Sequence, residues 1–399
     1  MVINLSLEWD YYKLEELINL RTGKLDSNAE EENGNYPFFT CAPDPLKINS
    51  FSFDQPAILL AGNNANGNFH INYYEGKFDA YQRTYVIDVL NKEKIDLKFL
   101  YYAMKICLKD FKRMSQGTST RFLTKKILDN FEIQVPNMET QLKIVEVLDA
   151  ISNKININQR INKNLFNIAS SIQTEWMINF TPFKSEKFKT SSFGLIPENW
   201  NVGKLGDVIE LLDSKRIPLS GQQRENMEKI YPYYGAASLM DYVEDYIFDG
   251  VYLLMGEDGT VVDDKGFPIL QYVWGKFWVN NHAHILKGKN GFNVESLYLL
   301  LSKTNIQSIV TGAVQAKVNQ SNLKSIEIII PPVDVMEKFN KLIKPFFDTI
   351  RSNNDEIKEL QKLRDTLLPK LMSGEIDVSK INCDLLIKIL EFLFFMIIN

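Results

Sequence analysis

The three histidines, His70, His282 and His284, are the side chains of this sequence best suited to metal binding or acid-base chemistry. His282 and His284 stand two residues apart, so in a β-strand both would lie on one face. No carboxylate or thiol stands nearby at a spacing typical of a zinc site. We therefore predict a structural role for the histidines, with their ring nitrogens satisfied by hydrogen bonds.

An acidic segment, 257–265, is a second candidate for chemistry. Asp263, Asp264 and Lys265 form an acid and lysine pattern reminiscent of metal-dependent nucleases, but a turn rich in solvated acids explains it as well. The sequence has no Gly-x-Gly-x-x-Gly, no Gly-Lys-Ser/Thr phosphate loop, and no Asn-Pro-Pro-aromatic motif of the kind that holds a flipped adenine. We predict that the chain is not an enzyme, with no catalytic residue, no metal site and no cofactor.

The distribution of basic and acidic residues is more informative than the candidate catalytic residues. Segment 112–126 has five basic residues and no acid around the small-residue loop 116–120, and segment 303–324 has three lysines and no acid around loop 311–316. Small residues let backbone N–H groups approach phosphates, while glutamine and arginine side chains can read base edges. A solvated surface loop is the alternative. The candidate DNA-binding residues are Lys112, Arg113, Gln116, Thr118, Ser119, Arg121, Lys125, Lys303, Gln315, Lys317 and Lys324.

These loops must be positioned by a larger scaffold, and the sequence contains a long helical pattern twice. Apolar residues alternate at steps of four and three through 140–177, and the pattern returns through 335–372 at an offset of 195 residues. This spacing is typical of a coiled-coil seam, and two copies can satisfy each other if they run antiparallel. The residues expected at this helix or subunit interface are Ile144, Leu148, Ile151, Ile155, Asn158, Leu165, Ile172, Ile350, Asn353, Ile357, Leu360 and Leu367.

Two asparagines and one proline interrupt the seams. Asn158 and Asn353 fill equivalent gaps, where buried polar residues would fix the register at some cost in stability, or would merely loosen the seam. Pro345 lacks the N–H that a helix interior needs, so we expect a kink or break there and regular helix only after it.

The regions before the two helices also repeat, which indicates tandem duplicated domains. Each combines short β-type runs with a helical run and loops rich in Asn, Gly and Asp, which predicts the α+β class. The matching is strong at the strand ends and weak in the loops. The predicted organisation, with an internal pseudo-twofold, is a first domain 1–136, a first helix 137–181, a linker 182–199, a second domain 200–332, a second helix 333–378 and an apolar tail 379–399.

Composition narrows the class of protein. The 399 residues are 45% hydrophobic and 24% charged, as expected for a folded chain with two ordinary domains. The net charge of -5 argues against a protein that simply coats nucleic acid. The three cysteines, far apart and odd in number, fit a reducing compartment, and the N-terminal residues lack the pattern of a secretory signal. We expect a cytoplasmic protein that does not enter a membrane.

With these residues in view, the chain up to about Val378 resembles the specificity subunit of type I restriction-modification enzymes. The resemblance is carried by the order and spacing of several pieces, and the second half matches better than the first, which departs at 38–41 and 62–67. The pieces are Gly194-Leu-Ile-Pro-Glu-Asn-Trp200, Lys204-Leu-Gly-Asp207, Tyr231-Pro-Tyr-Tyr-Gly235, Gly256-Glu-Asp-Gly259, Asn281-His-Ala-His284, the Gly312 loop, Ile328-Ile-Ile-Pro-Pro332 and Leu367-Leu-Pro-Lys-Leu-Met-Ser-Gly-Glu-Ile376.

The resemblance implies a non-catalytic reader of double-stranded DNA that acts in phage defence. Two target recognition domains would each read half of a split sequence, and the paired helices would set the gap. Two adenine methyltransferase (modification) subunits would dock on those helices, and restriction subunits with translocase activity would join the larger assembly.

Two alternatives remain at this point. One is a coiled-coil scaffold or adaptor without a DNA role, and the other is a fused restriction enzyme with its own nuclease near Asp258. The tail departs from the family: 385–399 is almost wholly apolar but shorter than the roughly 20 residues of a membrane-spanning helix. We expect it to form a helix that packs on this or a neighbouring subunit.

Overall fold

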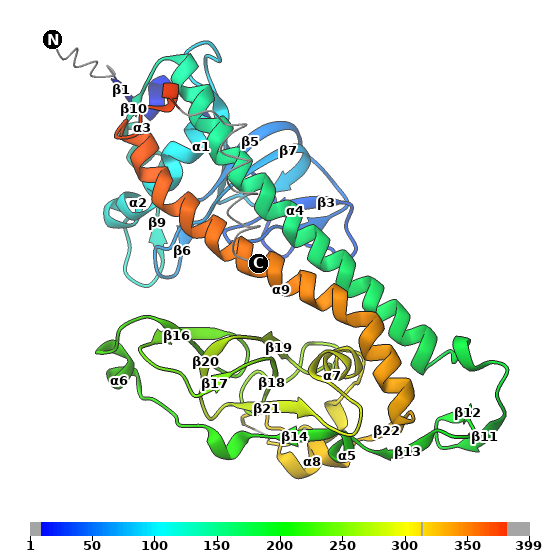
Figure 1. The fold of residues 1–399 in the computed structure, drawn as a ribbon. Coiled ribbons are helices and arrows are strands. Elements are labelled where there is room, and N and C mark those ends of the chain that lie inside the picture. The colour runs from blue at the N-terminus through cyan, green and yellow to red at the C-terminus, as the bar shows by residue number, and fades with distance from the viewer. Residues whose placement is uncertain (1–8, 313, 381–399) are drawn as a thin grey trace. The chain divides into compact units, whose positions relative to one another are not determined.

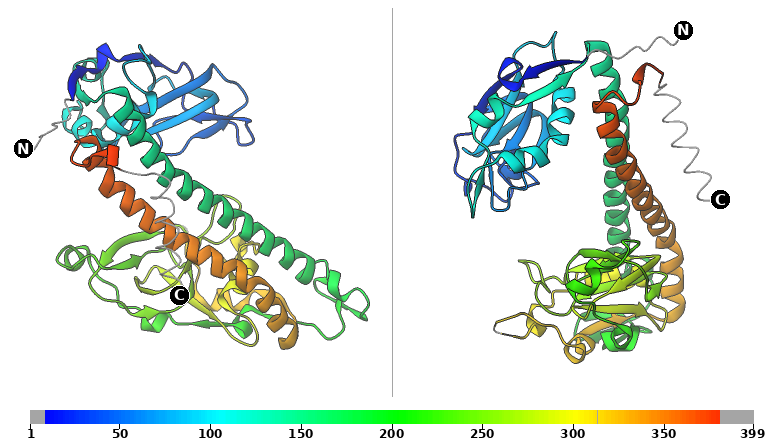
Figure 2. Two further views of the ribbon diagram at one scale, coloured as in Figure 1. Left: turned by 45° about the horizontal axis from the view of Figure 1, so that its top comes forward. Right: turned by 90° about the vertical axis from the view of Figure 1, so that its left-hand side faces the viewer.

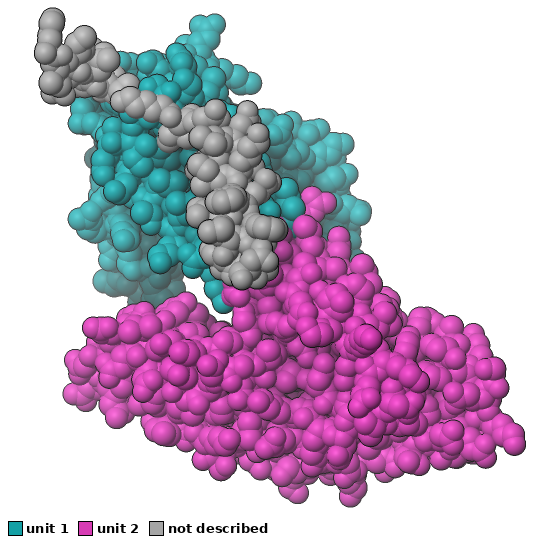
Figure 3. Space-filling model, in the orientation of Figure 1, with its two compact units in different colours: residues 1–157, 356–399 teal, residues 158–355 magenta. Residues whose placement is uncertain are grey.

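The computed structural model describes residues 9–312 and 314–380. The chain divides into two compact units (Figures 1 and 3). Unit 1 combines residues up to 157 with those from 356 onward, and unit 2 comprises 158–355. Two 40-residue helices, α4 (Met138–Met177) and α9 (Val333–Met372), each contribute one part to each unit. The predicted pair of α+β domains with long helices is therefore confirmed.

Unit 1 is built on a six-stranded sheet in the order β2-β8-β5-β7-β3-β4. Its centre is the apolar end of β5, where residues 57–61 are all buried. Helix α1 covers one face, and its N-terminus is capped by the Asp96 carboxylate, which accepts from the Lys98 and Phe99 amides. The elements are β1 (Asp10–Lys13), η1 (Leu14–Glu16), β2 (Ile18–Thr22), β3 (Tyr36–Phe39), β4 (Leu46–Ile48), β5 (Phe53–Ala61), β6 (Asn63–Asn64), β7 (Ile71–Ala80), β8 (Thr84–Val89), α1 (Leu97–Ile106), α2 (Leu108–Met114), β9 (Arg121–Phe122), α3 (Lys125–Asp129), β10 (Glu132–Val135) and η5 (Val378–Lys380).

Unit 2 has two four-stranded sheets, β14-β21-β18-β19 and β16-β15-β20-β17. Helix α7 is capped by Asn293, the counterpart of Asp96. The elements are η2 (Thr181–Phe183), β11 (Phe188–Ser191), β12 (Gly194–Pro197), β13 (Asn201–Lys204), α5 (Leu205–Val208), β14 (Ile209–Leu211), η3 (Asp213–Lys215), α6 (Gly221–Glu225), β15 (Tyr231–Tyr234), β16 (Leu239–Val243), β17 (Phe248–Asp249), β18 (Tyr252–Gly256), β19 (Leu270–Val273), β20 (Lys276–Val279), β21 (Ala283–Gly288), α7 (Val294–Leu301), η4 (Gln307–Ile309), α8 (Gln320–Ser325) and β22 (Glu327–Ile330).

The strand registers show that the two units repeat one frame. Leu60 faces Tyr85 between β5 and β8, and Met255 faces His284 between β18 and β21. The unusual parallel pair recurs as well: Phe38 beside Asp79 in unit 1 matches Tyr233 beside Trp278 in unit 2. In this frame Leu59 corresponds to Leu254.

Helices α4 and α9 run side by side within each unit (Figure 2). Their seam residues are mostly buried there. In unit 1, Ile151 and Ile155 form a cluster with Ile357 and Leu360, and Leu367 packs at its edge. Ile144 and Leu148 join the main core of that unit, which also contains Leu371 near the end of α9. In unit 2, Ile350 is buried in the core, and Leu165 and Ile172 pack against it.

The two seam asparagines are buried, with Asn158 2% and Asn353 9% exposed. The amide of Asn353 donates to Oδ1 of Asn162 at 2.8 Å, so its polar group is satisfied by the facing helix. Asn162 also donates, at 3.5 Å, to the Ile350 carbonyl. Asn353 is thus tied to one register, which favours the first of the two interpretations for this residue.

Of the kink or break expected at Pro345, the break does not occur, because α9 runs from Val333 through the proline without interruption. Phe339 and Ile343 before the proline, and Phe347 and Ile350 after it, are all buried in the same core. Burying four large side chains outweighs the roughly 3 kcal/mol that a helix-interior proline costs. Tertiary packing therefore overrides the local preference.

The segment 182–199, which we expected to be a linker, contains a folded hairpin of β11 and β12. Ile196 in β12 and Phe183 before the hairpin are buried together with Trp200. The polar composition misled because only these few apolar residues are needed to anchor a short hairpin. The predicted apolar helix of the tail lies outside the described residues, which for this part end at Lys380.

In the part of the chain that the structure describes, none of the helices combines the length and apolar character needed to cross a membrane.

Candidate nucleic-acid interface

The two basic loops predicted from sequence have the same backbone structure. Gln116 and Phe122 exchange both backbone hydrogen bonds, at 3.0 and 2.7 Å, and Thr311 and Lys317 do the same at 2.8 and 2.7 Å. The glycines that follow, Gly117 and Gly312, have φ angles of 107° and 91°. A Cβ at either would stand 2.1 Å from a carbonyl oxygen across the loop, so only glycine fits there.

Each loop is joined to the same place in its unit. The Leu123 amide donates to the Gly62 carbonyl at 2.9 Å, and the Val318 amide donates to the Glu257 carbonyl at 2.8 Å. In unit 1, β6 pairs with β9 and thereby links the asparagine-rich turn 62–68 to the loop. In unit 2, the Gly259 amide donates to the Ala316 carbonyl at 3.0 Å. Two neighbouring loops thus form one exposed surface in each unit.

In unit 1, the predicted residues fall into two groups. Gln116, Thr118 and Ser119 are exposed on the loop with polar groups free to meet a partner. Arg121 instead holds the loop together, because its guanidinium donates to Ser115 Oγ and to the Ser115 carbonyl, both at 2.7 Å. Lys112 donates to Asn68 Oδ1 at 2.6 Å across the two loops.

The remaining basic residues of this region pair locally. Arg113 forms an ion pair with Asp110 but stays 78% exposed, and Lys125 contacts Asp129 at 2.6 Å while 64% exposed. Such exposed pairs are worth only about 0.3–0.5 kcal/mol, so both cations can exchange their partner for a phosphate.

In unit 2, all four predicted residues are exposed, but one of them bonds to a long helix. Gln315 is exposed on the loop, Lys317 is exposed 3.5 Å from Glu257, and Lys324 is exposed on α8. Lys303 differs from the other three, because its ammonium donates to the Ser170 carbonyl at 2.6 Å and to Thr174 Oγ1 on helix α4. Burial lowers the pKa of Lys303, as expected for a group docked on protein. This contact ties Lys303 to helix α4, and its place in the DNA interface stays a prediction.

Two cationic or ionisable residues beside these loops were not among the predicted DNA-binding residues. Arg83 lies over the Phe122 ring at 5.5 Å, and His282, at the equivalent place in unit 2, contacts Asp258. Arg83 directly precedes strand β8, and His282 directly precedes strand β21. The Arg83 carbonyl accepts from the Gly62 amide, and the His282 carbonyl accepts from the Glu257 amide. Only the strand registers reveal this equivalence, since the loop sequences differ.

Buried below the unit 2 loop is a network of charged groups. His284 is fully buried, with Nδ1 2.6 Å from Asp213 Oδ2 and Nε2 2.7 Å from the Val318 carbonyl. Both ring nitrogens of His284 are thus within hydrogen-bond distance of an oxygen atom. Arg216 donates to Glu257 Oε2 at 2.6 Å. The predicted structural role of His284 fits this geometry.

Asp213 is the centre of this network. Burial alone would raise the pKa of the Asp213 carboxyl, but hydrogen bonds from His284 and the Ile285 amide, together with Arg216, lower it below its usual value. Asp213, Glu257 and His284 each bring one ligand atom within 4.8 Å of the others. A divalent metal does not fit this group, because the Arg216 guanidinium already lies 3.7 Å from the Asp213 carboxylate and 2.6 Å from the Glu257 carboxylate.

The acids of the nuclease alternative do not converge. Glu257 meets Arg216 and Lys317, and Asp258 meets His282. Asp263 accepts from the amides of Lys265 and Phe267 and so shapes its own turn. Each of these three carboxylates thus has a structural partner, and no observation favours a nuclease here.

Comparison with known proteins agrees with this geometry. Residues 6–167 and 197–362 both match the family described as "Type I restriction modification DNA specificity domain". The chain is 28% identical over 415 residues to the type I restriction enzyme EcoDI specificity subunit of Escherichia coli, covering 93% of this chain and 89% of that protein. It is 27% identical over 315 residues to the MjaIX specificity subunit of Methanocaldococcus jannaschii, covering 74% and 72%.

A solved structure has a similar fold. The S subunit of a type I restriction-modification system from M. genitalium superposes with a TM-score of 0.56 at 18% identity, over 93% of this chain and 98% of that one. Two matched copies of the domain, on a frame whose strand registers repeat, account for most of the described residues. The chain therefore belongs to the family of type I restriction-modification DNA specificity subunits.

Proposed function

We propose that this chain is the non-catalytic reader of a bipartite duplex DNA target, with one half of the target read by each unit. The observation that carries the proposal is the repeated loop frame: loops 116–122 and 311–317 share their hydrogen bonds and their obligatory glycine. The side chains on this common frame differ, with Thr118 and Ser119 in one unit and Gln315 in the other. A shared scaffold with different exposed side chains is what two readers of different sequences require.

The long helices would act as a spacer and a scaffold. Contacts between α4 and α9 inside each unit support an antiparallel coiled coil: Ile151 and Ile357 belong to one buried cluster, and Asn353 bonds to Asn162. A helix of fixed length would keep the unspecified gap of the target constant. The outer faces of the same helices would bind two adenine methyltransferase subunits, and restriction subunits would join that complex in the cytoplasm.

The experiment is to purify the full chain alone and together with its methyltransferase subunits. We expect the chain alone to retain duplex DNA but to transfer no methyl group, and the complex to methylate one split motif in the host genome. Methyl transfer by the chain alone would contradict the non-catalytic assignment. A scaffold without a DNA role would retain no duplex at moderate salt, in any complex.

A further inference from the structure

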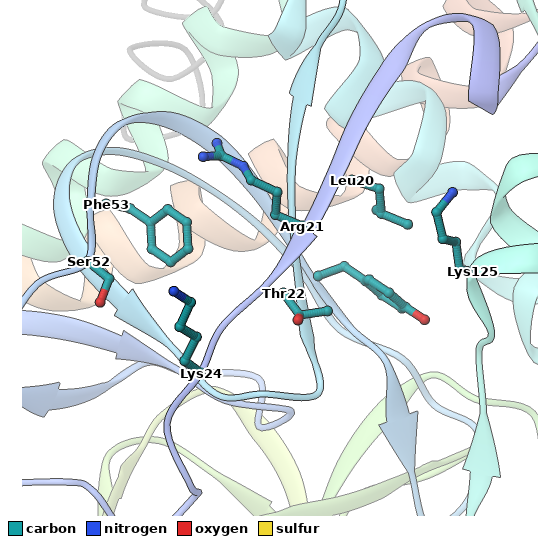
Figure 4. A pocket seen from close by; sticks show the side chains of 8 residues that line it. Leu20, Arg21, Thr22, Lys24, Ser52, Phe53 and Lys125 are labelled. Atoms are coloured by element: carbon teal, nitrogen blue, oxygen red, sulfur yellow. The ribbon is translucent and has the colours of Figure 1, made fainter.

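Unit 1 has a pocket at the edge strand β2, and Lys125 is the one predicted DNA-binding residue among those that line it. Its volume is about 740 Å³. Figure 4 shows three cationic side chains, Arg21, Lys24 and Lys125, around it. The other lining residues are Leu20, Thr22, Ser52, Phe53 and Tyr85.

The same position of the repeated frame is filled in unit 2. In unit 1, Thr22 faces Tyr85. In unit 2, Asp213 stands at the place of Thr22 and His284 at the place of Tyr85. Asp213 Oδ2 accepts from His284 at 2.6 Å and from Gln320 Nε2 at 2.6 Å. A carboxylate with bonded partners therefore occupies this place in unit 2.

The ring that faces this place makes one equivalent hydrogen bond in both units. Tyr85 Oη donates to the Leu123 carbonyl at 2.8 Å, as His284 Nε2 donates to the Val318 carbonyl at 2.7 Å. Lys125 and Gln320 are the first residues of the equivalent helices α3 and α8. Unit 1 thus has a hydroxyl where unit 2 has a carboxylate, and an ammonium where unit 2 has an amide.

The charges around the unit 1 pocket are incompletely balanced. Arg21 pairs with Asp88 at 2.7 Å, and Lys125 pairs with Asp129 at 2.6 Å. Among the residues that the structure describes, no hydrogen bond or ion pair reaches the Lys24 ammonium. The pocket therefore has one surplus cation and lacks the anion that Asp213 provides in unit 2.

We propose that this pocket binds one phosphodiester group of duplex DNA, at the place where unit 2 holds its own Asp213 carboxylate. The inference rests on the proposed DNA-reading function and adds an anchor that unit 1 has and unit 2 lacks. Lys24 supplies the unpaired charge. Lys125 exchanges a weak surface pair for the phosphate, and the Thr22 hydroxyl is available as a donor. Phosphate contacts fix position without reading bases, so the pocket contributes affinity and leaves the recognised sequence unchanged.

The test measures binding of the full chain to a mixed-sequence DNA duplex over a series of salt concentrations. Two variants remove the site in different ways: Lys24→Gln combined with Lys125→Gln removes two cations, and Thr22→Asp installs the carboxylate of unit 2. Lys47→Gln is the control, because Lys47 is exposed on β4, the opposite edge of the six-stranded sheet. Circular dichroism melting checks that each variant is folded.

Losing one phosphate contact should reduce the slope of log K against log [salt] by about 0.9. We expect that reduction in both site variants, an unchanged slope in Lys47→Gln, and an unchanged methylated motif when the variants are supplied with methyltransferase subunits. If the double variant does not fold, the salt slope of Thr22→Asp alone tests the proposal.

Three results would overturn the proposal. If a folded site variant keeps the salt slope of the parent chain, and the parent chain binds DNA, the pocket does not bind a DNA phosphate, but the proposed function stands. If the parent chain does not bind DNA, both the pocket proposal and the proposed DNA-reading function are wrong. If inorganic phosphate raises the melting temperature of the parent chain but not of Thr22→Asp, while both keep the same DNA slope, the pocket binds a free anion instead of DNA.

Discussion

Lys98 and Glu295 occupy the same position, the second residue of the equivalent helices α1 and α7, and carry opposite charges. Lys98 pairs with Asp149 of α4 at 2.6 Å, and Glu295 pairs with Arg351 of α9 at 2.8 Å. The hydrogen bond to Asp149 raises the pKa of Lys98, so it stays charged. Each domain therefore docks on the helix beside it through an ion pair of reversed polarity.

Reversal of one charge in the unit 2 pair should destabilise that unit. Glu295 and Arg351 are only 13% and 20% exposed, so we expect Glu295→Lys to cost about 3–5 kcal/mol, measured as a shift in the urea midpoint of that unit. Adding Arg351→Glu should recover much of the loss. A double variant no more stable than the single one would show that the pair does not dock the helix. Lys98→Glu is the matched comparison and should cost less, because Lys98 is 37% exposed and better screened by solvent.

The ring hydrogen bonds to the loop carbonyls should control loop dynamics. Tyr85→Phe removes the donor to the Leu123 carbonyl and should cost about 1 kcal/mol locally. Amide exchange at Gln116 and Phe122 should then become faster, because the loop is held from this carbonyl. Tyr36→Phe in strand β3 serves as control. Exchange rates that remain as in the parent chain would mean that the bond does not hold the loop.

The lowered pKa of Asp213 predicts a pH dependence of unit 2. The Asp213 carboxyl has a lower pKa in the folded chain than the ordinary value of about 3.9, so its contribution to stability is complete above about pH 4 to 5. That contribution is lost as the pH falls through the folded pKa, because the unfolded state then binds the proton more readily. Asp213→Asn should be less stable at neutral pH and should lose less stability on acidification. Parallel pH profiles of urea midpoints for the parent and the variant would contradict this.

Much of this architecture could be predicted because it depends on repeated patterns. The heptad spacing located α4 and α9, and the offset of 195 residues brings Gly117 onto Gly312 from residue numbers alone. Local rules failed where packing dominates, as at Pro345, and where a few apolar residues anchor a polar segment, as at Phe183 and Ile196.

The binding residues were harder to predict than the frame. Basic residues such as Lys303 and Arg121 look alike in sequence, but one donates to helix α4 and the other to its own loop. Asp213 and His284 are 71 residues apart, and only strand pairing brings them to 2.6 Å. Arg21 and Lys24 likewise become candidates only through the register of β2.

A change of helix length tests the proposed spacer. Removal of 155–161 from α4 and of 350–356 from α9 deletes one heptad from each helix and keeps the phase of the seam. A heptad is about 10 Å of helix, or about three base pairs at about 3.4 Å each. We expect the gap of the methylated motif to shorten while both half-sequences remain, as read by methylome sequencing.

The control for this deletion removes four residues from each helix instead of seven. That change rotates Ile151 and Leu165 off a common stripe and should destabilise the chain, which a lower melting temperature would report. A folded heptad variant that methylates with an unchanged gap would show that the helices do not set the spacing.

The central claim is that each unit reads its own half of the target, and a domain replacement tests it most directly. Residues 200–331 are exchanged for the corresponding domain of a relative that methylates a different motif, and the methylome of the host is sequenced. The account predicts that one half of the methylated motif changes to that of the donor, while the other half stays as it was. A change in both halves, or in neither, would contradict it.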